Sequence, residues 1–202
     1  NATGAFSDSI RKMAGGTVQE MIAPSQGIHL VFDGSFLEGT DAVLVPRTSD
    51  GRVLFAIPWH AHTLVGTTDT PVEAATLEPR ATEQEIDFIL GTAGLYLHRA
   101  PTRADILSMW AGIRPLVRST SGANTASLSR DHSIHIDPNG LLTIAGGKWT
   151  TYRNMAEDCV NQAATLAGLP DRPSVTKTLP IHRYDNGANN VEQFVRQEMA
   201  RT

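Results

Sequence analysis

The run from Thr143 to Arg153 joins a short apolar strand to a predicted helix through Gly146-Gly147-Lys148. Glycine allows a ligand to approach the backbone closely, and the start of a helix presents free N–H groups and the positive end of its dipole. An anionic group can bind at such a junction. The same residues also fit a tight turn in which Thr150 or Thr151 caps the helix, so the spacing alone leaves both interpretations open.

The elements on either side of this junction follow from the pattern of apolar residues. After Thr151 the apolar residues recur with helical periodicity, and Gly168 and Pro170 end the helix. Cys159, the single cysteine, falls on the apolar face of this helix and is expected to be a buried thiol. Residues 170–180 contain three prolines and are interpreted as a linker, followed by a tail with one short helix near 191–199.

The preceding part of the chain is predicted to be mainly β. A short helix is expected over 5–13, and short runs rich in β-branched and aromatic residues then favour an antiparallel sheet. The predicted strands are 28–32, 42–45, 53–57, 63–67 and 106–111, with a polar loop at 118–126 and a hairpin of 133–136 and 141–144 around Pro138-Asn139-Gly140. Thr82 and Glu85 form a capping-box pattern that predicts a helix immediately after it.

Composition narrows the possible functions. A chain of 202 residues with 41% apolar content can form one large domain or pieces of two. The formal charge of −4 argues against a nucleic-acid surface, and one cysteine allows no intramolecular disulfide. The seven histidines show no metal-binding spacing, so no metal site is predicted. There is no apolar run of membrane-spanning length and no signal-peptide pattern.

Seven stretches, in order along the chain, resemble the flavin-dependent glycerol-3-phosphate dehydrogenases, which use FAD and pass electrons towards quinone. These stretches are residues 1–4, 27–31, 55–59, 66–70, 111–116, 129–132 and 146–153. Together they span roughly residues 1–168. The resemblance therefore extends over most of the chain and does not depend on one motif.

Two departures from the family pattern suggest that the chain is part of a longer enzyme. The GxGxxG of the ADP-binding βαβ unit is absent, and the tail could supply only the start of the family's helical C-terminal domain. The resemblance then implies an α+β fold, in which an antiparallel substrate-binding sheet with flanking helices joins the C-terminal part of an FAD-binding α/β domain. Residues 1–15 are expected to be the end of an FAD-binding segment, and residues 16–105 to form the substrate-binding sheet. Residues 106–168 are expected to be the returning part of the FAD-binding domain, and residues 169–202 a linker and the start of the helical region. Such a piece is expected to be inactive alone and to hold FAD poorly.

The reaction implied is oxidation of sn-glycerol 3-phosphate to dihydroxyacetone phosphate. Arg114 and Arg130, both at predicted strand ends, suit the phosphate because guanidinium groups pair bidentately with phosphate oxygens. Lys148 is expected near the phosphate or the flavin, and His29 is the candidate base or partner of the substrate hydroxyl. Catalytic roles are thus assigned to His29, Arg114 and Lys148, and substrate contacts to these three and Arg130. The alternative for the arginines and the lysine is a surface or ion-paired cation, and the alternative for His29 is a structural histidine.

The resemblance also implies flavin contacts, from N–H groups that would stabilise negative charge on the reduced ring. The candidate cofactor-binding residues are Thr3, Gly4, Gly146, Gly147, Lys148, Trp149, Thr150 and Thr151. Asp69 and Asp131 are interpreted as turn and positioning residues, and Trp59 and Trp149 as packing residues.

The partners expected are glycerol 3-phosphate, a quinone acceptor and the surface of a membrane, on its cytoplasmic side, with no nucleic acid; a homo-oligomer is left open. Two other functions remain open at this point. One is a related oxidase or dehydrogenase of an amino or hydroxy acid, which would need one arginine for a carboxylate. The other is a cofactor-free binding domain.

Overall fold

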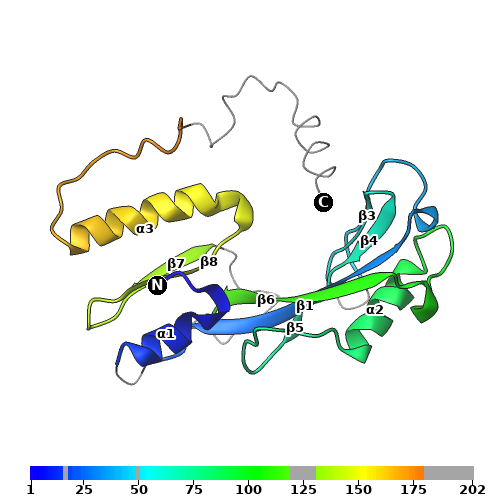
Figure 1. Ribbon diagram of the computed structural model, residues 1–202, viewed down its shortest axis with the longest axis horizontal. Helices are drawn as coiled ribbons and strands as arrows, with labels where there is room; N and C mark the ends of the chain where they lie inside the picture. Colours follow the sequence, from blue (N-terminus) through cyan, green and yellow to red (C-terminus); the bar gives the residue numbers. More distant parts are fainter. Residues whose placement is uncertain (16–17, 49–50, 119–130, 180–202) are drawn as a thin grey trace, which may run out of the picture. The chain divides into compact units, whose positions relative to one another are not determined.

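A computed structural model describes residues 1–15, 18–48, 51–118 and 131–179 of the 202-residue chain (Figure 1). The contacts divide the chain into two units, Asn1–Thr150 and Thr151–Thr202, and each unit is described by itself. The α-helices are α1 (Ser7–Met13), α2 (Glu83–Ala93) and α3 (Tyr152–Leu166). Short 3-10 helices are η1 (Gly4–Phe6), η2 (Gly34–Phe36), η3 (Arg103–Asp105) and η5 (Trp149–Thr151). The strands are β1 (Ile22–Asp33), β2 (Val43–Val45), β3 (Leu54–Trp59), β4 (His62–Gly66), β5 (Thr70–Pro71), β6 (Ser108–Val117), β7 (His132–Ile136) and β8 (Leu142–Gly146).

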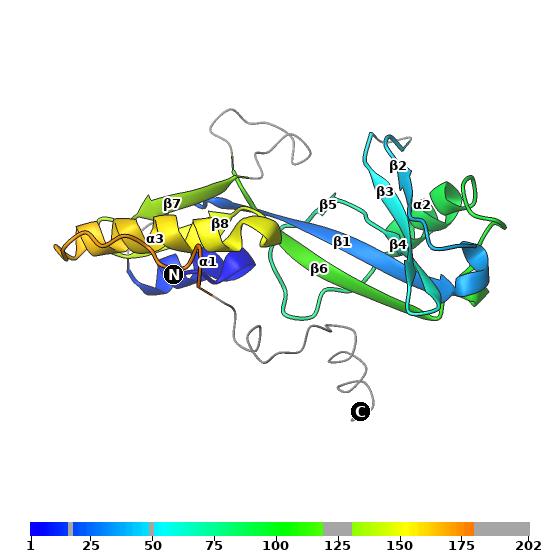
Figure 2. The same ribbon diagram turned by 90° about the horizontal axis from the view of Figure 1, so that it is seen from above.

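The main sheet of the first unit is built around β1. Its strand order is β2-β3-β4-β1-β5, and β6 pairs with the other edge of β1. Every pair in this sheet is antiparallel, as the short neighbouring runs in the sequence predicted. Figure 2 shows β1 and β6 side by side along their length. The predicted antiparallel sheet with flanking helices is therefore confirmed.

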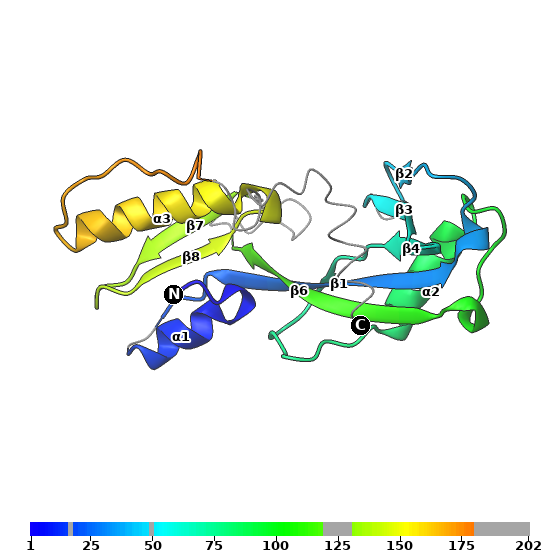
Figure 3. The same ribbon diagram turned by 45° about the horizontal axis from the view of Figure 1, so that its top comes forward.

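One face of this sheet forms the core with α2 (Figure 3). Ile28, Leu30 and Phe32 of β1 are fully buried there with Ile86 and Ile89 of α2. The predicted capping box begins α2, because the Thr82 hydroxyl accepts from Glu85 N and the Glu85 carboxylate accepts from Thr82 N. The capping interaction fixes where α2 starts and so which of its residues face the sheet.

Strands β1 and β6 are longer than the sequence predicted. β1 begins at Ile22 rather than 28, and β6 continues through Gly112 to Val117, so that Arg114 lies inside the strand and not at its end. A proline has no N–H to donate to a ladder and is therefore unusual inside a strand that pairs on both sides. In the structure Pro115 lies directly opposite Pro24. Pro24 O accepts from Val72 N, so the backbone polar groups of Pro24 face β5 and not β6, whereas Met21 O, three residues earlier, accepts from Arg118 N. Pro24 and Pro115 therefore form a non-hydrogen-bonded pair, and neither ring removes a hydrogen bond between β1 and β6.

A second sheet consists of the hairpin β7–β8, with Gly140 at positive φ in its turn as predicted. The N-terminal residue extends this sheet, because Asn1 N donates to Leu142 O at 2.9 Å and Ile144 N donates to Asn1 O at 3.0 Å. This is the hydrogen-bond pattern of a parallel pair. The start of the chain is thereby held beside β8.

The second unit contains α3, which ends before Gly168 at a φ of +66°, as the sequence predicted. Cys159 is partly exposed rather than buried, and no residue of α3 is buried. The expectation of a buried thiol was therefore wrong, because an apolar helix face is covered only when another element packs on it. The helix predicted near 191–199 lies outside the described residues. Among the helices that the structure describes, none combines the length and the apolarity needed to cross a membrane.

Candidate functional site

The face of the main sheet opposite α2 carries the candidate site; we call it the open face. Residues that pair across antiparallel strands share a face, and one row across five strands consists of Leu44, Phe55, Gly66, His29 and Trp110. The side chains of Leu44, Phe55 and Trp110 are between 43% and 53% exposed. Two rows further along on the same face, beyond the pair of Gly27 and Gly112, Arg114 pairs with Ser25. The register therefore places the predicted His29 and Arg114 on the same face, four residues apart along β1.

Two glycines make room for these side chains. A Cβ atom added to Gly66 would overlap the imidazole of His29, and one added to Gly27 would overlap the guanidinium of Arg114. Both side chains thus lie flat across neighbouring strands instead of projecting from the sheet. Because Arg114 covers Gly27, its guanidinium lies over the residue two positions before His29 on β1, and the two side chains approach each other.

The guanidinium of Arg114 is held by three consecutive residues between β4 and β5. Its Nη1 donates to Thr68 O at 3.0 Å and its Nη2 to Thr67 Oγ1 at 2.9 Å. Asp69 Oδ1 lies 3.7 Å from Nη1 and accepts a hydrogen bond from the Ser25 hydroxyl. The Arg114 side chain is 34% exposed, so these contacts hold a guanidinium that is still partly accessible to solvent.

The His29 ring stacks on Trp110 and is partly buried. Burial lowers the pKa of His29 below its ordinary value, and the positive charge of Arg114 lowers it further. At neutral pH the imidazole is therefore uncharged, which is the form that can accept a proton.

Two further segments converge at the end of β6 that follows Arg114. A Cβ atom on Gly4 would lie 3.9 Å from the Pro115 ring, and one on Gly146 would lie 3.1 Å from Val117 Cγ2. Gly4, Gly146 and Gly147 have φ values of +59°, +77° and +76°, a region that favours glycine. The structure thus brings the predicted cofactor-binding residues Gly4 and Gly146 next to the strand that carries Arg114.

Comparison with known proteins identifies the family of the chain. Residues 1–153 match the family described as FAD dependent oxidoreductase. The chain belongs to the FAD dependent oxidoreductase family. It is 48% identical over 178 residues to the mitochondrial glycerol-3-phosphate dehydrogenase of Rattus norvegicus and 47% identical over 178 residues to that of Homo sapiens. Each alignment covers 87% of the chain and 24% of the relative, so the chain spans about a quarter of the length of these relatives.

A solved structure supports the same assignment. The glycerol-3-phosphate dehydrogenase from Bacillus halodurans, complexed with FAD, matches the chain with a TM-score of 0.71 and 34% identity. The match covers 86% of this chain and 33% of that one. The resemblance inferred from seven short stretches is confirmed, and FAD is the cofactor of the family to which the chain belongs.

The residues present fit one part of an FAD site of this family. Left-handed glycines at Gly4, Gly146 and Gly147 lie on two segments, and such positions allow a flat ring to approach the backbone closely. The part of an FAD site that binds the pyrophosphate is not found in this sequence, because the 202 residues contain no GxGxxG. We therefore assign Thr3, Gly4 and Gly146–Thr150 to the flavin as a prediction that the backbone geometry supports. Thr151 begins the second unit and is the N-cap of α3, without a side-chain capping hydrogen bond.

Other predicted residues are placed as follows. Lys148 is exposed just after β8. Arg130 lies outside the described residues, so its predicted contact with phosphate stays a prediction.

Trp59 and Trp149 were expected to pack but are 53% and 87% exposed, because the first lies at a hairpin end and the second in η5. Trp110 was not singled out from the sequence; only the register, which sets it against His29, identifies it.

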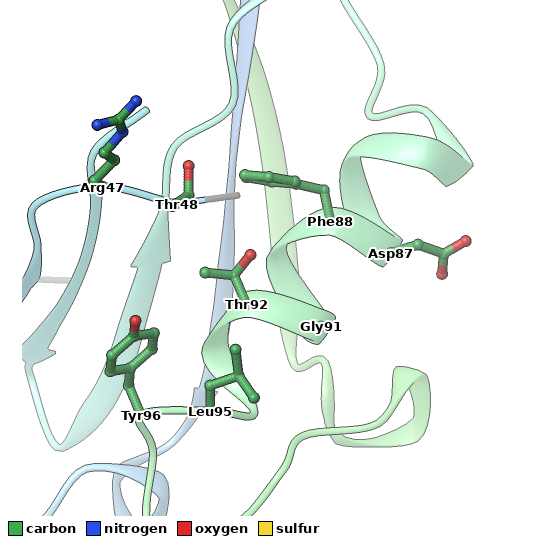
Figure 4. Close-up of a pocket in the computed structure, with 8 residues that line it drawn as sticks. All are labelled: Arg47, Thr48, Asp87, Phe88, Gly91, Thr92, Leu95 and Tyr96. Carbon is green, nitrogen blue, oxygen red and sulfur yellow. The ribbon is translucent and has the colours of Figure 1, made fainter. Parts of the chain in front are cut away.

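A hollow of about 290 Å³ lies elsewhere on the first unit, between α2 and the segment after β2 (Figure 4). Phe88 and Thr92 point from α2 towards Thr48, whereas Asp87 points away. Its other lining residues are Arg47, Gly91, Leu95 and Tyr96. None of the predicted site residues lines it, and we assign it no role in the reaction.

Proposed function

We propose that the chain forms the substrate-binding part of an FAD-dependent sn-glycerol-3-phosphate dehydrogenase, which oxidises glycerol 3-phosphate to dihydroxyacetone phosphate. The observation that carries this proposal is that Arg114 and His29 share the open face, close enough for the charge of Arg114 to lower the pKa of His29, beside the glycine segments that fit a flavin. A substrate with an anionic end and an alcohol needs one cation and one proton acceptor on the same surface. The names and 47–48% identity of the mammalian relatives support the same substrate.

In this proposal Arg114 binds the phosphate dianion. A guanidinium carries five N–H donors in one plane, so the hydrogen bonds to Thr67 and Thr68 set the orientation of that plane while the group pairs with phosphate oxygens. Lys148 and Arg130 are proposed as further cations for the same dianion, a role for which arginine and lysine are both suited.

His29 is proposed to take the proton of the reacting hydroxyl. Its lowered pKa keeps a ring nitrogen unprotonated at neutral pH, and stacking on Trp110 fixes the ring plane and shields one face from water. FAD, when bound, supplies the acceptor for the hydride that leaves the alcohol carbon. We further propose that electrons continue to a quinone and that the enzyme works at a membrane surface; these two points come from the family resemblance.

The test is substitution of Arg114 in the complete dehydrogenase that carries this chain. Arg114→Ala should raise KM for glycerol 3-phosphate by about 30- to 1,000-fold, because a charge-assisted contact to a dianion is worth about 2–4 kcal/mol. Flavin content should stay unchanged. Activity towards glycerol, which lacks the phosphate, should be affected much less.

Arg103→Ala is the matched control, since Arg103 is an exposed arginine that pairs with Glu83 and Asp87. It should leave KM unchanged. A KM for Arg114→Ala within a few-fold of the parent's would place the phosphate elsewhere. Turnover of a carboxylate substrate with no activity on glycerol 3-phosphate would instead support an amino- or hydroxy-acid oxidase.

A further inference from the structure

Glu85 is a buried carboxylate whose contacts exceed those of a helix cap. It is 4% exposed, and its capping role needs only the hydrogen bond from Thr82 N. Four more donors point at it: Thr82 Oγ1 at 3.0 Å, Gln26 Nε2 at 2.7 Å, Thr68 Oγ1 at 2.9 Å and Thr70 Oγ1 at 2.9 Å. Burial acts to raise the pKa of Glu85, but these hydrogen bonds outweigh it and the pKa is lowered, so the group is an ionised acceptor.

Thr68 and Thr70 lie where the pairing along one edge of β1 is interrupted between β4 and β5. Pairing of β1 with β4 ends at His29 and Gly66, and pairing with β5 resumes at Gln26 and Thr70. Three residues, 67–69, thus lie opposite the two residues Gly27 and Ile28. An unequal count of this kind is a bulge, which bends the strand and redirects its carbonyl groups.

Thr68 is the residue that fixes this bulge. Its hydroxyl donates to Glu85 Oε1 and accepts from Ile28 N at 3.1 Å. Its own carbonyl accepts from Arg114 Nη1 at 3.0 Å on the other side of the sheet. Successive residues of β1 point to opposite faces, so Glu85 contacts Gln26 on the core face while Arg114 covers Gly27 on the open face.

We propose that Glu85 is a positioning residue for the anion site, holding Thr68 and Thr70 so that the Thr67–Asp69 bulge presents its acceptors to Arg114. Glu85 touches neither Arg114 nor the open face. Its effect on the substrate passes entirely through the bulge. The consequence for catalysis rests on the proposed function of Arg114, whereas the effect on the guanidinium itself does not.

Glu85→Gln is the informative substitution, because glutamine also serves at this position of a capping box. The amide has one acceptor oxygen, so it cannot accept from both the Thr68–Thr70 side and the Gln26–Thr82 side. The second variant, Thr68→Val, removes the hydroxyl that links Glu85 to the bulge and leaves the capping box intact. Glu83→Gln is the control, since Glu83 is in the same helical turn but is exposed and pairs with Arg103.

The first measurement is the rate at which phenylglyoxal modifies Arg114 in the flavin-loaded dehydrogenase, followed by peptide mass spectrometry. A guanidinium that loses its fixed acceptors reacts faster, and we expect about a tenfold increase in both variants, the ratio that corresponds to one charge-assisted hydrogen bond. Glu83→Gln should react like the parent. An unchanged rate in Glu85→Gln and Thr68→Val overturns the proposal, whatever the substrate of the enzyme is.

The second measurement is KM for glycerol 3-phosphate in a double-mutant cycle. Glu85→Gln should raise KM about tenfold in the parent and have no effect when Arg114 is already alanine. A rise of equal size in both backgrounds would show that Glu85 acts by another route and would overturn the proposal. Faster labelling combined with no effect of Arg114→Ala on KM would leave Glu85 as the positioning residue and reject Arg114 as the phosphate ligand.

Discussion

The imidazole of His29 lies nearly parallel to the indole of Trp110, with ring centroids 5.6 Å apart and an interplanar angle of 15°. Trp110 follows from the register of β6, and Gly66 on the other side of β1 leaves room for the ring to lie across the sheet. His29 therefore has one orientation set by its neighbours. The pKa of His29 is lowered by burial and, to a smaller extent, by the charge of Arg114.

The first prediction concerns the acid limb of the pH profile of kcat/KM in the complete dehydrogenase. If neutral His29 accepts the substrate proton, activity falls when the ring is protonated, and the limb should lie below the ordinary histidine value of about 6.5. Arg114→Gln removes a positive charge that disfavours protonation, so the pKa should rise and the limb should move to higher pH. Arg114→Lys keeps the charge and is the control. If the acid limb lies at the same pH in the parent, Arg114→Gln and Arg114→Lys, the proton transfer belongs to another group.

Much of the fold could be predicted because local signals agreed with the tertiary structure. The capping box at Thr82 and Glu85, the turn before Gly140 and the stop at Gly168 each depend on a few neighbouring residues, and each is confirmed. The extent of β6 could not be predicted, because its continuation depends on the register that places Pro115 opposite Pro24 at a non-hydrogen-bonded position. A pairing between residues so far apart in the sequence leaves no local signal.

The residues of the candidate site also differ in whether the sequence alone could identify them. His29 and Arg114 were found from residue type and family resemblance, and the register then showed that they share a face. Trp110 was missed because an indole in a strand pattern looks like any core residue. Glu85 was assigned only its capping role, since its contacts with Thr68 and Thr70 arise from packing of α2 on the sheet.

The second prediction concerns the buried ion pair that anchors α1. Arg11 is 4% exposed, and its guanidinium donates to Asp137 at 2.8 and 2.9 Å and to Asp8 at 3.0 Å. Arg11→Met leaves two carboxylates without their cation and should lower the free energy of unfolding by about 3–5 kcal/mol. Urea unfolding measures this. Lys12→Met, which removes an exposed cation from the same helix, should have little effect, and equal losses in the two variants would contradict the role of burial.

The third prediction is the pH dependence of that stabilisation. The hydrogen bond from Arg11 is the largest cause of the lowered pKa of Asp137. A carboxyl with a depressed pKa contributes stability above its unfolded pKa of about 3.9 and loses it as pH falls through the lower folded value. The difference in stability between the parent and Arg11→Met should therefore be constant near neutrality and shrink below about pH 4. A difference that persists unchanged at lower pH would assign the loss to packing of the arginine side chain.

The fourth prediction concerns the two-residue turn between β3 and β4. His60 and Ala61 have φ values of +45° and +62°, the left-handed region that hairpin turns of this kind require. Alanine in this region costs about 1–2 kcal/mol, and glycine does not, although glycine adds about 0.4–1 kcal/mol of unfolded-state entropy. Ala61→Gly should thus raise the free energy of unfolding by up to about 1 kcal/mol. Ala56→Gly, in the buried part of β3, should lower it, and thermal unfolding of both variants gives the comparison.

The last prediction concerns Gly147, which follows β8 with a φ of +76°. Valine resists positive φ, so Gly147→Val should displace the backbone N–H groups that are proposed to face the flavin. At that position the N–H groups would stabilise negative charge on the reduced ring, so their displacement should lower the midpoint potential of the bound FAD. A loss of about 1.4 kcal/mol corresponds to about 30 mV for a two-electron couple. Gly140→Val is a matched control, because Gly140 has a φ of +85° in the β7–β8 turn and nothing lies within 4 Å of an added Cβ atom. Both variants should lose stability from backbone strain, and only Gly147→Val should lose potential as well. If the two variants melt at similarly lowered temperatures and both keep the parent's potential, Gly147 serves the turn alone and the flavin contact must be assigned to other residues.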